Sequence, residues 1–178
     1  MIYRVLTAKP ESDTPVMANV GSNARGAPPD ISQMSPRERF LRLSDRVLGA
    51  AEKGDTAAVT RFAPMALAAY GMLDSVDDDA RYHAALLDLK LGHAPEALAL
   101  ADTILAASPH HLLAYLIQIG AAEQAGNRPE SERVRKNFLA AYPAEIKSGR
   151  PEYDEHRAVL QQAETSFAQD QAKRPPPP

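Results

Sequence analysis

The sequence predicts an all-α protein, and three observations lead to that prediction. Apolar residues recur at helical spacing through the middle of the chain, whereas no segment alternates apolar and polar residues as a strand does. Hydrophobic residues make up 44% of the 178 positions, enough for the core of one domain. Prolines stand at the two ends of the chain or where helices are expected to begin, end or bend. We therefore expect one helical body between two extended tails.

The expected organisation is an arm at residues 1–34, a helical body at residues 35–170 and a Pro-rich tail at residues 171–178. The arm carries balanced charges and several Gly and Pro residues, so it can bury little apolar surface by itself. Its apolar start lacks the basic region and cleavage site of a signal peptide. Because polyproline is extended and stiff before binding, we expect both tails to dock on neighbouring proteins. The candidate contact residues in the tails are Tyr3, Arg4, Val5, Leu6, Arg174, Pro175, Pro176, Pro177 and Pro178.

The first two helices have recognisable starts. Ser35 is expected as the N-cap of the first helix, with Pro36 in its first turn and Glu38 completing a capping box. Asp55, which follows directly after Gly54, is expected to cap the second helix. The apolar stripe of this helix continues beyond Pro64, so that proline is expected to kink the helix rather than end it.

An internal repeat is the most informative pattern in the chain. The segment 92–96 (Gly-His-Ala-Pro-Glu) is matched by the segment 126–130 (Gly-Asn-Arg-Pro-Glu), 34 positions later. Pro109 and Pro143 stand at the same spacing and are expected to end the second helix of each unit. Each unit then consists of an apolar helix, a Gly-containing turn and a second helix. A helix–turn–helix period of about 34 residues is typical of tetratricopeptide repeats.

On these residues the chain resembles the tetratricopeptide repeat family. The resemblance places Gly92 and Gly126 in the turns between helices, and it implies a stack of helix pairs that share one apolar core. Two departures concern the first helices of the units. The aromatic that the family carries early in this helix is present as Tyr115 in one unit, whereas the other unit has Arg81 there, beside Tyr82. The small residue that the family carries at the helix–helix contact is present as Ala85, whereas the next unit has Ile119 or Gly120.

A third, more divergent unit is expected upstream, where Gly54 and Asp55 resemble the same turn. About three helix pairs then precede a last helix, which begins near Pro151. An apolar stripe on this helix is expected to cap the final pair and leave the other face solvated. The stripe consists of Tyr153, His156, Leu160, Ala163 and Phe167.

The sequence offers little support for an enzyme. It has no cysteine, which excludes thiolate chemistry, and it lacks the glycine-rich loops and the nucleophile motif of common enzyme classes. The pair His110–His111 is expected as a solvated helix opening, and the run Asp77–Asp79 as a helix cap. His83 and His93 have no acidic or thiol group expected near them, so we predict neither a metal site nor a cofactor. A hydrolase with an unrecognised site is one alternative for the function.

Binding to other proteins is the function that the pattern favours. Nucleic acid is not expected as a partner because the formal net charge is −3, and no apolar run is long enough to span a bilayer. The concave side of a tetratricopeptide-like stack is lined by the first helix of each pair, and a helix or an extended peptide fits such a groove. The candidate groove residues are Tyr82, Leu86, Lys90, Leu116 and Gln124. The two tyrosines Tyr82 and Tyr115 can equally belong to the core of the repeat.

Two hypotheses about function follow. The first is a non-catalytic scaffold whose body and tails hold together the subunits of a larger complex. In this form the chain is similar to the extrinsic tetratricopeptide-type polypeptides of bacterial reaction-centre and light-harvesting complexes. That resemblance implies a cytoplasmic protein located at the cytoplasmic face of the inner membrane. The second hypothesis is a soluble adaptor or co-chaperone that binds a peptide or helix in its concave groove.

Overall fold

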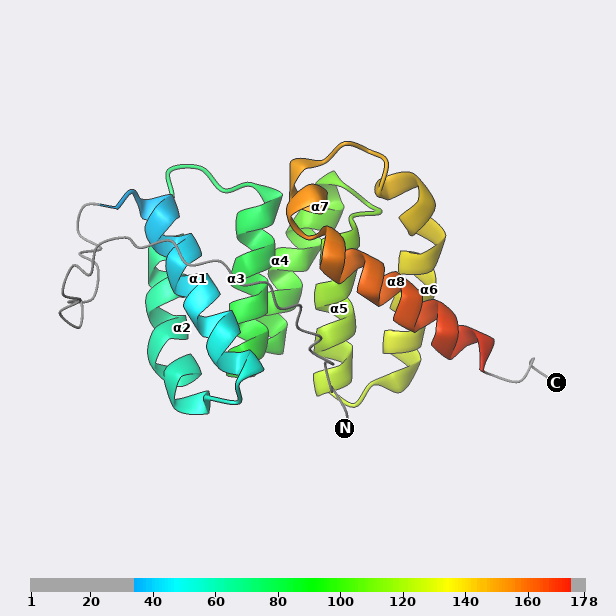
Figure 1. The fold of residues 1–178 in the computed structure, drawn as a ribbon, viewed down its shortest axis with the longest axis horizontal. Helices are drawn as coiled ribbons and strands as arrows, with labels where there is room; N and C mark the ends of the chain where they lie inside the picture. The colour runs from blue at the N-terminus through cyan, green and yellow to red at the C-terminus, as the bar shows by residue number, and fades with distance from the viewer. Residues whose placement is uncertain (1–33, 174–178) are drawn as a thin grey trace, which may run out of the picture. The chain divides into compact units, whose positions relative to one another are not determined.

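The computed structural model describes residues 34–173, which form eight helices and no strand (Figure 1). The prediction of an all-α protein is therefore confirmed for this part of the chain. None of these helices combines the length and the apolar character needed to cross a membrane. The predicted contact residues of the two tails lie outside the described residues. In chain order the helices are α1 (Pro36–Glu52), α2 (Thr56–Tyr70), α3 (Asp78–Leu91), α4 (Ala94–Ala107), α5 (Leu112–Gln124), α6 (Arg128–Glu145), α7 (Pro151–Glu155) and α8 (Arg157–Ala172).

Short polar side chains begin the first two helices, as the sequence predicts. At α1 the backbone N–H of Glu38 donates to the Ser35 hydroxyl, and the Glu38 carboxylate accepts from the backbone N–H of Ser35 at 2.9 Å. At α2 the Asp55 carboxylate accepts from the backbone N–H of Ala58 at 2.9 Å. These contacts satisfy N–H groups that have no partner inside the helix. Helix α2 continues through Pro64.

A glycine in the left-handed conformation stands between the two helices of each pair. The φ angles are +71° at Gly54, +81° at Gly92 and +66° at Gly126. Residues with a Cβ atom rarely adopt such angles, so the chain reverses where glycine permits it. The helix starts repeat as well. Helices α3 and α5 begin at positions 78 and 112, and helices α4 and α6 begin at positions 94 and 128. Both intervals equal the interval between Gly92 and Gly126.

Pro109 and Pro143 behave differently, although the sequence predicts that both end a helix. Helix α4 ends at Ala107, so Pro109 follows it as predicted. The prediction for Pro143 is wrong, because α6 continues through this residue to Glu145. Proline cannot donate a backbone hydrogen bond, and its ring crowds the preceding turn. At Pro143 these effects concern only the last turn of α6, where backbone carbonyls are free to face solvent.

The capping helix that the sequence predicts is interrupted at His156, so it forms the two helices α7 and α8. No glycine or proline lies between positions 152 and 172, so local sequence does not cause this break. The predicted apolar stripe does face the body of the protein. Tyr153 and Leu160 are buried, and the Phe167 ring meets the Phe138 ring edge-on at a centroid distance of 5.4 Å.

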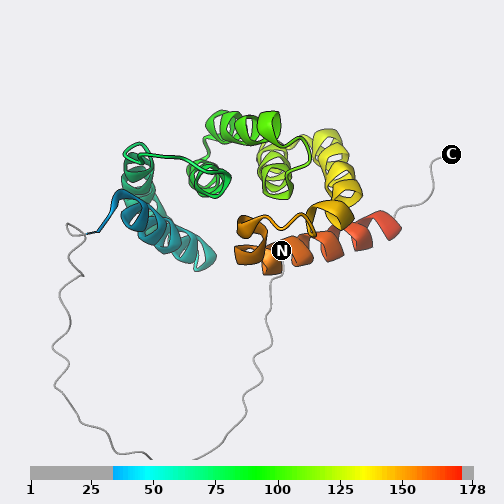
Figure 2. The ribbon, with the colours of Figure 1, turned by 90° about the horizontal axis from the view of Figure 1, so that it is seen from above.

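The helices pack as successive pairs. Helix α1 packs on α2, α3 on α4 and α5 on α6, while α2 contacts α3, α4 contacts α5, and α3 contacts both α1 and α5. Viewed from above, α4 lies on one side of the neighbouring helices α3 and α5, and α7–α8 lies on the other (Figure 2). Two apolar clusters result. One contains residues of α1, α2 and α3 around Phe40 and Leu87. The other contains residues of all the helices from α3 through α8, around Ile117 and Phe138.

Candidate functional site

The side of α3 and α5 that is turned away from α4 is covered by the C-terminal helices of the same chain (Figure 2). Two contacts anchor this arrangement. The backbone N–H of Leu112 donates to the Tyr153 hydroxyl at 2.9 Å, and His156 Nε2 lies 2.9 Å from Asp79 Oδ1. We call this covered side, which includes Asp79, Tyr82 and Leu112, the inner face.

Three of the predicted groove residues are partly or wholly covered. Tyr82 is only 3% exposed, and its ring meets the ring of His156 edge-on at a centroid distance of 4.9 Å. Leu86 and Leu116 are half-buried against the larger apolar cluster. Tyr82 is therefore inaccessible to a partner as long as α7 and α8 occupy the inner face.

The other two predicted groove residues are exposed. Lys90 lies in the last turn of α3, where its positive charge complements the helix dipole. The Gln124 side-chain amide donates to the backbone carbonyl of Leu89 at 2.7 Å, which satisfies a carbonyl at the end of α3. Lys90 is thus the groove residue whose polar group is available, and its contact with a partner stays a prediction.

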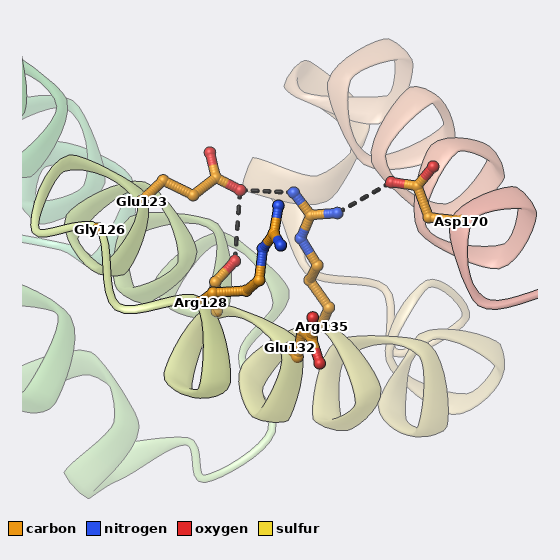
Figure 3. Close-up of a pocket in the computed structure, with 7 residues that line it drawn as sticks. Glu123, Gly126, Arg128, Glu132, Arg135 and Asp170 are labelled. Carbon is orange, nitrogen blue, oxygen red and sulfur yellow. Dashed lines mark hydrogen bonds and ion pairs between the residues drawn. The ribbon is translucent and has the colours of Figure 1, made fainter. Parts of the chain in front are cut away.

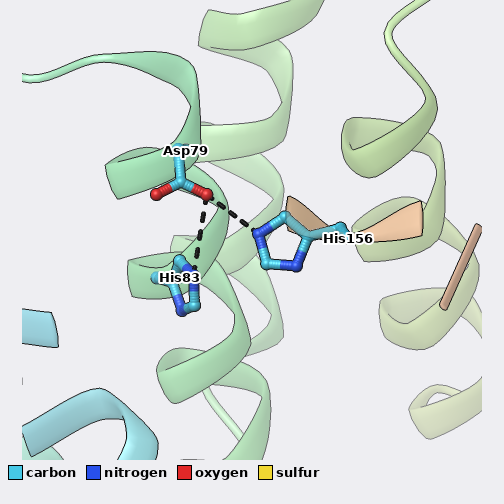
Figure 4. A group of neighbouring side chains, drawn as sticks. All are labelled: Asp79, His83 and His156. Atoms are coloured by element: carbon cyan, nitrogen blue, oxygen red, sulfur yellow. Dashed lines mark hydrogen bonds and ion pairs between the residues drawn. The ribbon is translucent and has the colours of Figure 1, made fainter. Parts of the chain in front are cut away.

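One oxygen of Asp79 lies beside two imidazole rings on the inner face (Figure 4). Oδ1 of Asp79 lies 2.9 Å from His156 Nε2 and 3.6 Å from His83 Nε2. Asp79 and His83 are four residues apart on α3 and therefore share one side of the helix. His156 comes from the break between α7 and α8. The expectation that no acidic group lies near His83 or His93 is therefore wrong, since His93 Nδ1 also lies 3.5 Å from Asp88 Oδ1.

Burial and neighbouring charges decide how this cluster titrates. Burial alone would raise the pKa of Asp79, but the hydrogen bond with His156 and the charges of the two imidazoles and Arg37 lower it below its usual value. Burial lowers the pKa of His83, although the nearby Asp79 carboxylate opposes that shift. These shifts favour the ionised carboxylate of Asp79 and the neutral imidazole of His83.

A second group of carboxylates and imidazole connects α3, α5 and α7. His111 Nε2 lies 3.1 Å from the Glu152 carboxylate, and Asp78 completes the group. Here arginines already pair with the carboxylates. Arg81 donates to Asp78 at 3.1 Å, and Arg150 lies 3.9 Å from Glu152. Each carboxylate of this group thus has an arginine beside it, as Asp79 has Arg37 at 3.8 Å.

His111 itself corrects a prediction. The sequence suggests a solvated pair at positions 110 and 111, but only His110 is exposed, and the His111 side chain is completely buried. The His111 ring packs on Tyr153 at a centroid distance of 5.1 Å. Burial lowers the pKa of His111 in spite of the Glu152 carboxylate beside it. Its burial depends on α7, which lies far along the chain, and no local sequence signal indicates it.

A polar cleft of about 720 Å³ lies where α5, α6 and α8 meet (Figure 3). Arg135 projects from α6 between two carboxylates, 2.5 Å from Glu123 on α5 and 3.0 Å from Asp170 on α8. Its guanidinium also lies over the Phe167 ring, 4.6 Å from the centroid. Arg135 thus links α6 to both α5 and α8 through two ion pairs.

A scan against protein-family models, a search of curated proteins and a search of solved structures each find no match to this chain. What the structure itself shows is an all-α class of protein over residues 34–173, with an inner face that its own C-terminal helices cover.

Proposed function

We propose that the chain is a tetratricopeptide-like solenoid that acts as a non-catalytic scaffold and holds together protein subunits of a larger complex. One observation carries the proposal. The two successive helix pairs α3–α4 and α5–α6 begin at positions 78 and 112, the spacing of the sequence repeat, and a left-handed glycine stands between the helices of each pair. The pair α1–α2 has the same kind of turn and packs on α3. Stacked helix pairs with this period are typical of proteins that bind other proteins through extended surfaces.

The position of α7 and α8 favours a scaffold over a groove-binding adaptor. A peptide that entered between α3 and α5 would first have to displace Tyr153, Leu160 and Phe167, which are packed on these helices and on α6. Displacing them costs several kcal/mol, since a fully buried large apolar side chain contributes about 1.5–3 kcal/mol and both Tyr153 and Leu160 are buried. A scaffold that binds through its tails and outer helices keeps these contacts. The finer form of the proposal, an extrinsic subunit of a bacterial photosynthetic or other energy-transducing complex, depends on the family resemblance alone.

The test compares two sets of variants of the full chain in co-purification from native membranes and cytosol. One set deletes residues 1–30, deletes residues 174–178, or replaces the four final prolines by serines, which keeps the length of the tail. The other set contains Lys90→Glu, at the exposed cationic group of the predicted groove. A scaffold loses its partner subunits in the tail variants and keeps them in Lys90→Glu, while circular dichroism shows an unchanged helical body. Loss of partners in Lys90→Glu alone would instead support the adaptor.

A further inference from the structure

The cluster of Asp79, His83 and His156 brings together three ligand atoms from segments that are far apart in sequence. His156 lies 77 residues from Asp79, yet all three ligand atoms lie within 4.8 Å of one another. The three side chains are only 11–15% exposed. Figure 4 shows both rings turned toward the same carboxylate oxygen. Such convergence in a nearly buried place requires the chain to hold three polar groups away from water, which is costly unless they are fully partnered.

The partners within the chain do not satisfy these groups completely. Nδ1 of His83 is buried without a hydrogen-bond partner among the described residues. Its Nε2 lies 3.6 Å from Asp79 Oδ1, which is too long for a good hydrogen bond. Arg37 approaches the other oxygen of Asp79 at 3.8 Å and leaves Oδ1 to the two imidazoles. The separation of 3.6 Å instead fits two ligands around a shared ion.

The geometry points to a divalent transition-metal site: we propose that Asp79, His83 and His156 bind one ion of the Zn²⁺ class, with solvent completing its coordination. Imidazole nitrogen and carboxylate oxygen are the ligands that Zn²⁺ takes up in proteins, at about 2.0–2.2 Å, so that two ligands of one tetrahedral ion stand roughly 3.4 Å apart. The separations of 2.9 and 3.6 Å lie on either side of this value.

The helix break at His156 agrees with this role. A continuous helix is expected from the sequence, but at His156 the backbone has φ −102° and ψ 16°, and the side chain meets α3. An ion bound to His156 and to Asp79 would join α7–α8 directly to α3. The ion would therefore fasten the C-terminal helices onto the inner face and stabilise the arrangement that covers Tyr82.

The experiment uses the full chain without a polyhistidine tag, freed of metal by a chelator that is then removed. Calorimetric titration with Zn²⁺ is expected to show one strong site per chain, and the melting temperature is expected to rise with Zn²⁺ concentration. Co²⁺ serves as a coloured probe, because a four-coordinate site with imidazole ligands absorbs strongly in the visible range. Hydrogen exchange in residues 157–172 is expected to slow when Zn²⁺ is present.

The chain contains five histidines, so each can be replaced in turn by glutamine, which keeps a side-chain donor. His83→Gln and His156→Gln are each expected to weaken Zn²⁺ binding by at least about tenfold and to remove the Co²⁺ absorption and the effect on hydrogen exchange. Having two such variants keeps the test valid if one of them fails to fold. His93→Gln, at an exposed position, and His111→Gln, in the second cluster, are matched controls that are expected to keep the site.

Two results would overturn the proposal. One is the absence of saturable Zn²⁺ and Co²⁺ binding by the folded wild-type chain, which would leave the cluster as an ion-pair network only. The other is a loss of binding in His93→Gln or His111→Gln while His83→Gln and His156→Gln bind as the wild type does.

Discussion

The hydroxyl of Tyr153 is expected to stabilise the start of α5 from a distant part of the chain. His111, the N-cap residue of α5, makes no side-chain capping bond, and the backbone N–H of Leu112 donates instead to the Tyr153 hydroxyl at 2.9 Å. The same hydroxyl donates to the Glu145 carboxylate at 3.0 Å. Both Leu112 and Tyr153 are at most 1% exposed, so water does not replace a lost bond. Tyr153→Phe therefore leaves a buried N–H without a partner.

We expect Tyr153→Phe to lower the free energy of unfolding by about 1–3 kcal/mol, the usual cost of one unsatisfied buried donor. The ring stays in place, so no cavity adds to this value. Urea unfolding followed by circular dichroism measures it, with the midpoint falling and the m value unchanged. Tyr142→Phe is the matched control, since Tyr142 is half-buried and the described part of the chain shows no hydrogen bond for its hydroxyl. A stability loss below about 0.5 kcal/mol in Tyr153→Phe, no larger than that of the control, would refute the capping role.

Three further predictions follow from single residues. Gly92→Ala is expected to lower the free energy of unfolding by about 1–2 kcal/mol because φ is +81°. Gly49→Ala, inside α1 with open space where the Cβ would stand, is expected to raise it by about 0.5–1 kcal/mol, and the urea midpoints of the two variants measure the difference. Burial holds the pKa of His111 below its usual 6.5, so the neutral ring contributes its full stabilisation above pH 6.5. The free energy of unfolding then falls as the pH drops below 6.5, by at most about 1.4 kcal/mol per pH unit. His111→Gln is expected to flatten this dependence in thermal melts at several pH values. Leu160→Ala removes the only buried residue of α8 and is expected to cost about 2–5 kcal/mol and to expose α8 to limited proteolysis; an unchanged digestion pattern would contradict that packing role.

Helix starts and turns are the features that local sequence predicts best. The capping box of Ser35 and Glu38, the Asp55 cap and the turn glycines Gly92 and Gly126 all lie where short-range chemistry requires them. Each of these signals acts between near neighbours in the chain, so it is visible without knowledge of the fold.

Features that depend on distant neighbours were not predictable in this way. Nothing in the local sequence around His156 breaks a helix, and nothing around His111 distinguishes a buried ring from a solvated one. The same holds for Asp79, which belongs to an acidic helix start but lies between two imidazoles. Even the continuation of α6 beyond Pro143 runs against the local rule.

The sequence by itself therefore determined the all-α class, the helix pairs and their period, because helical spacing and turn chemistry are properties of neighbouring residues. Only the tertiary structure decided that α7 and α8 cover the inner face and bring His156 to Asp79. The physical reason is that burial is shared between surfaces: an apolar stripe such as that of Tyr153 and Leu160 shows that a helix must pack, but the partner surface decides where.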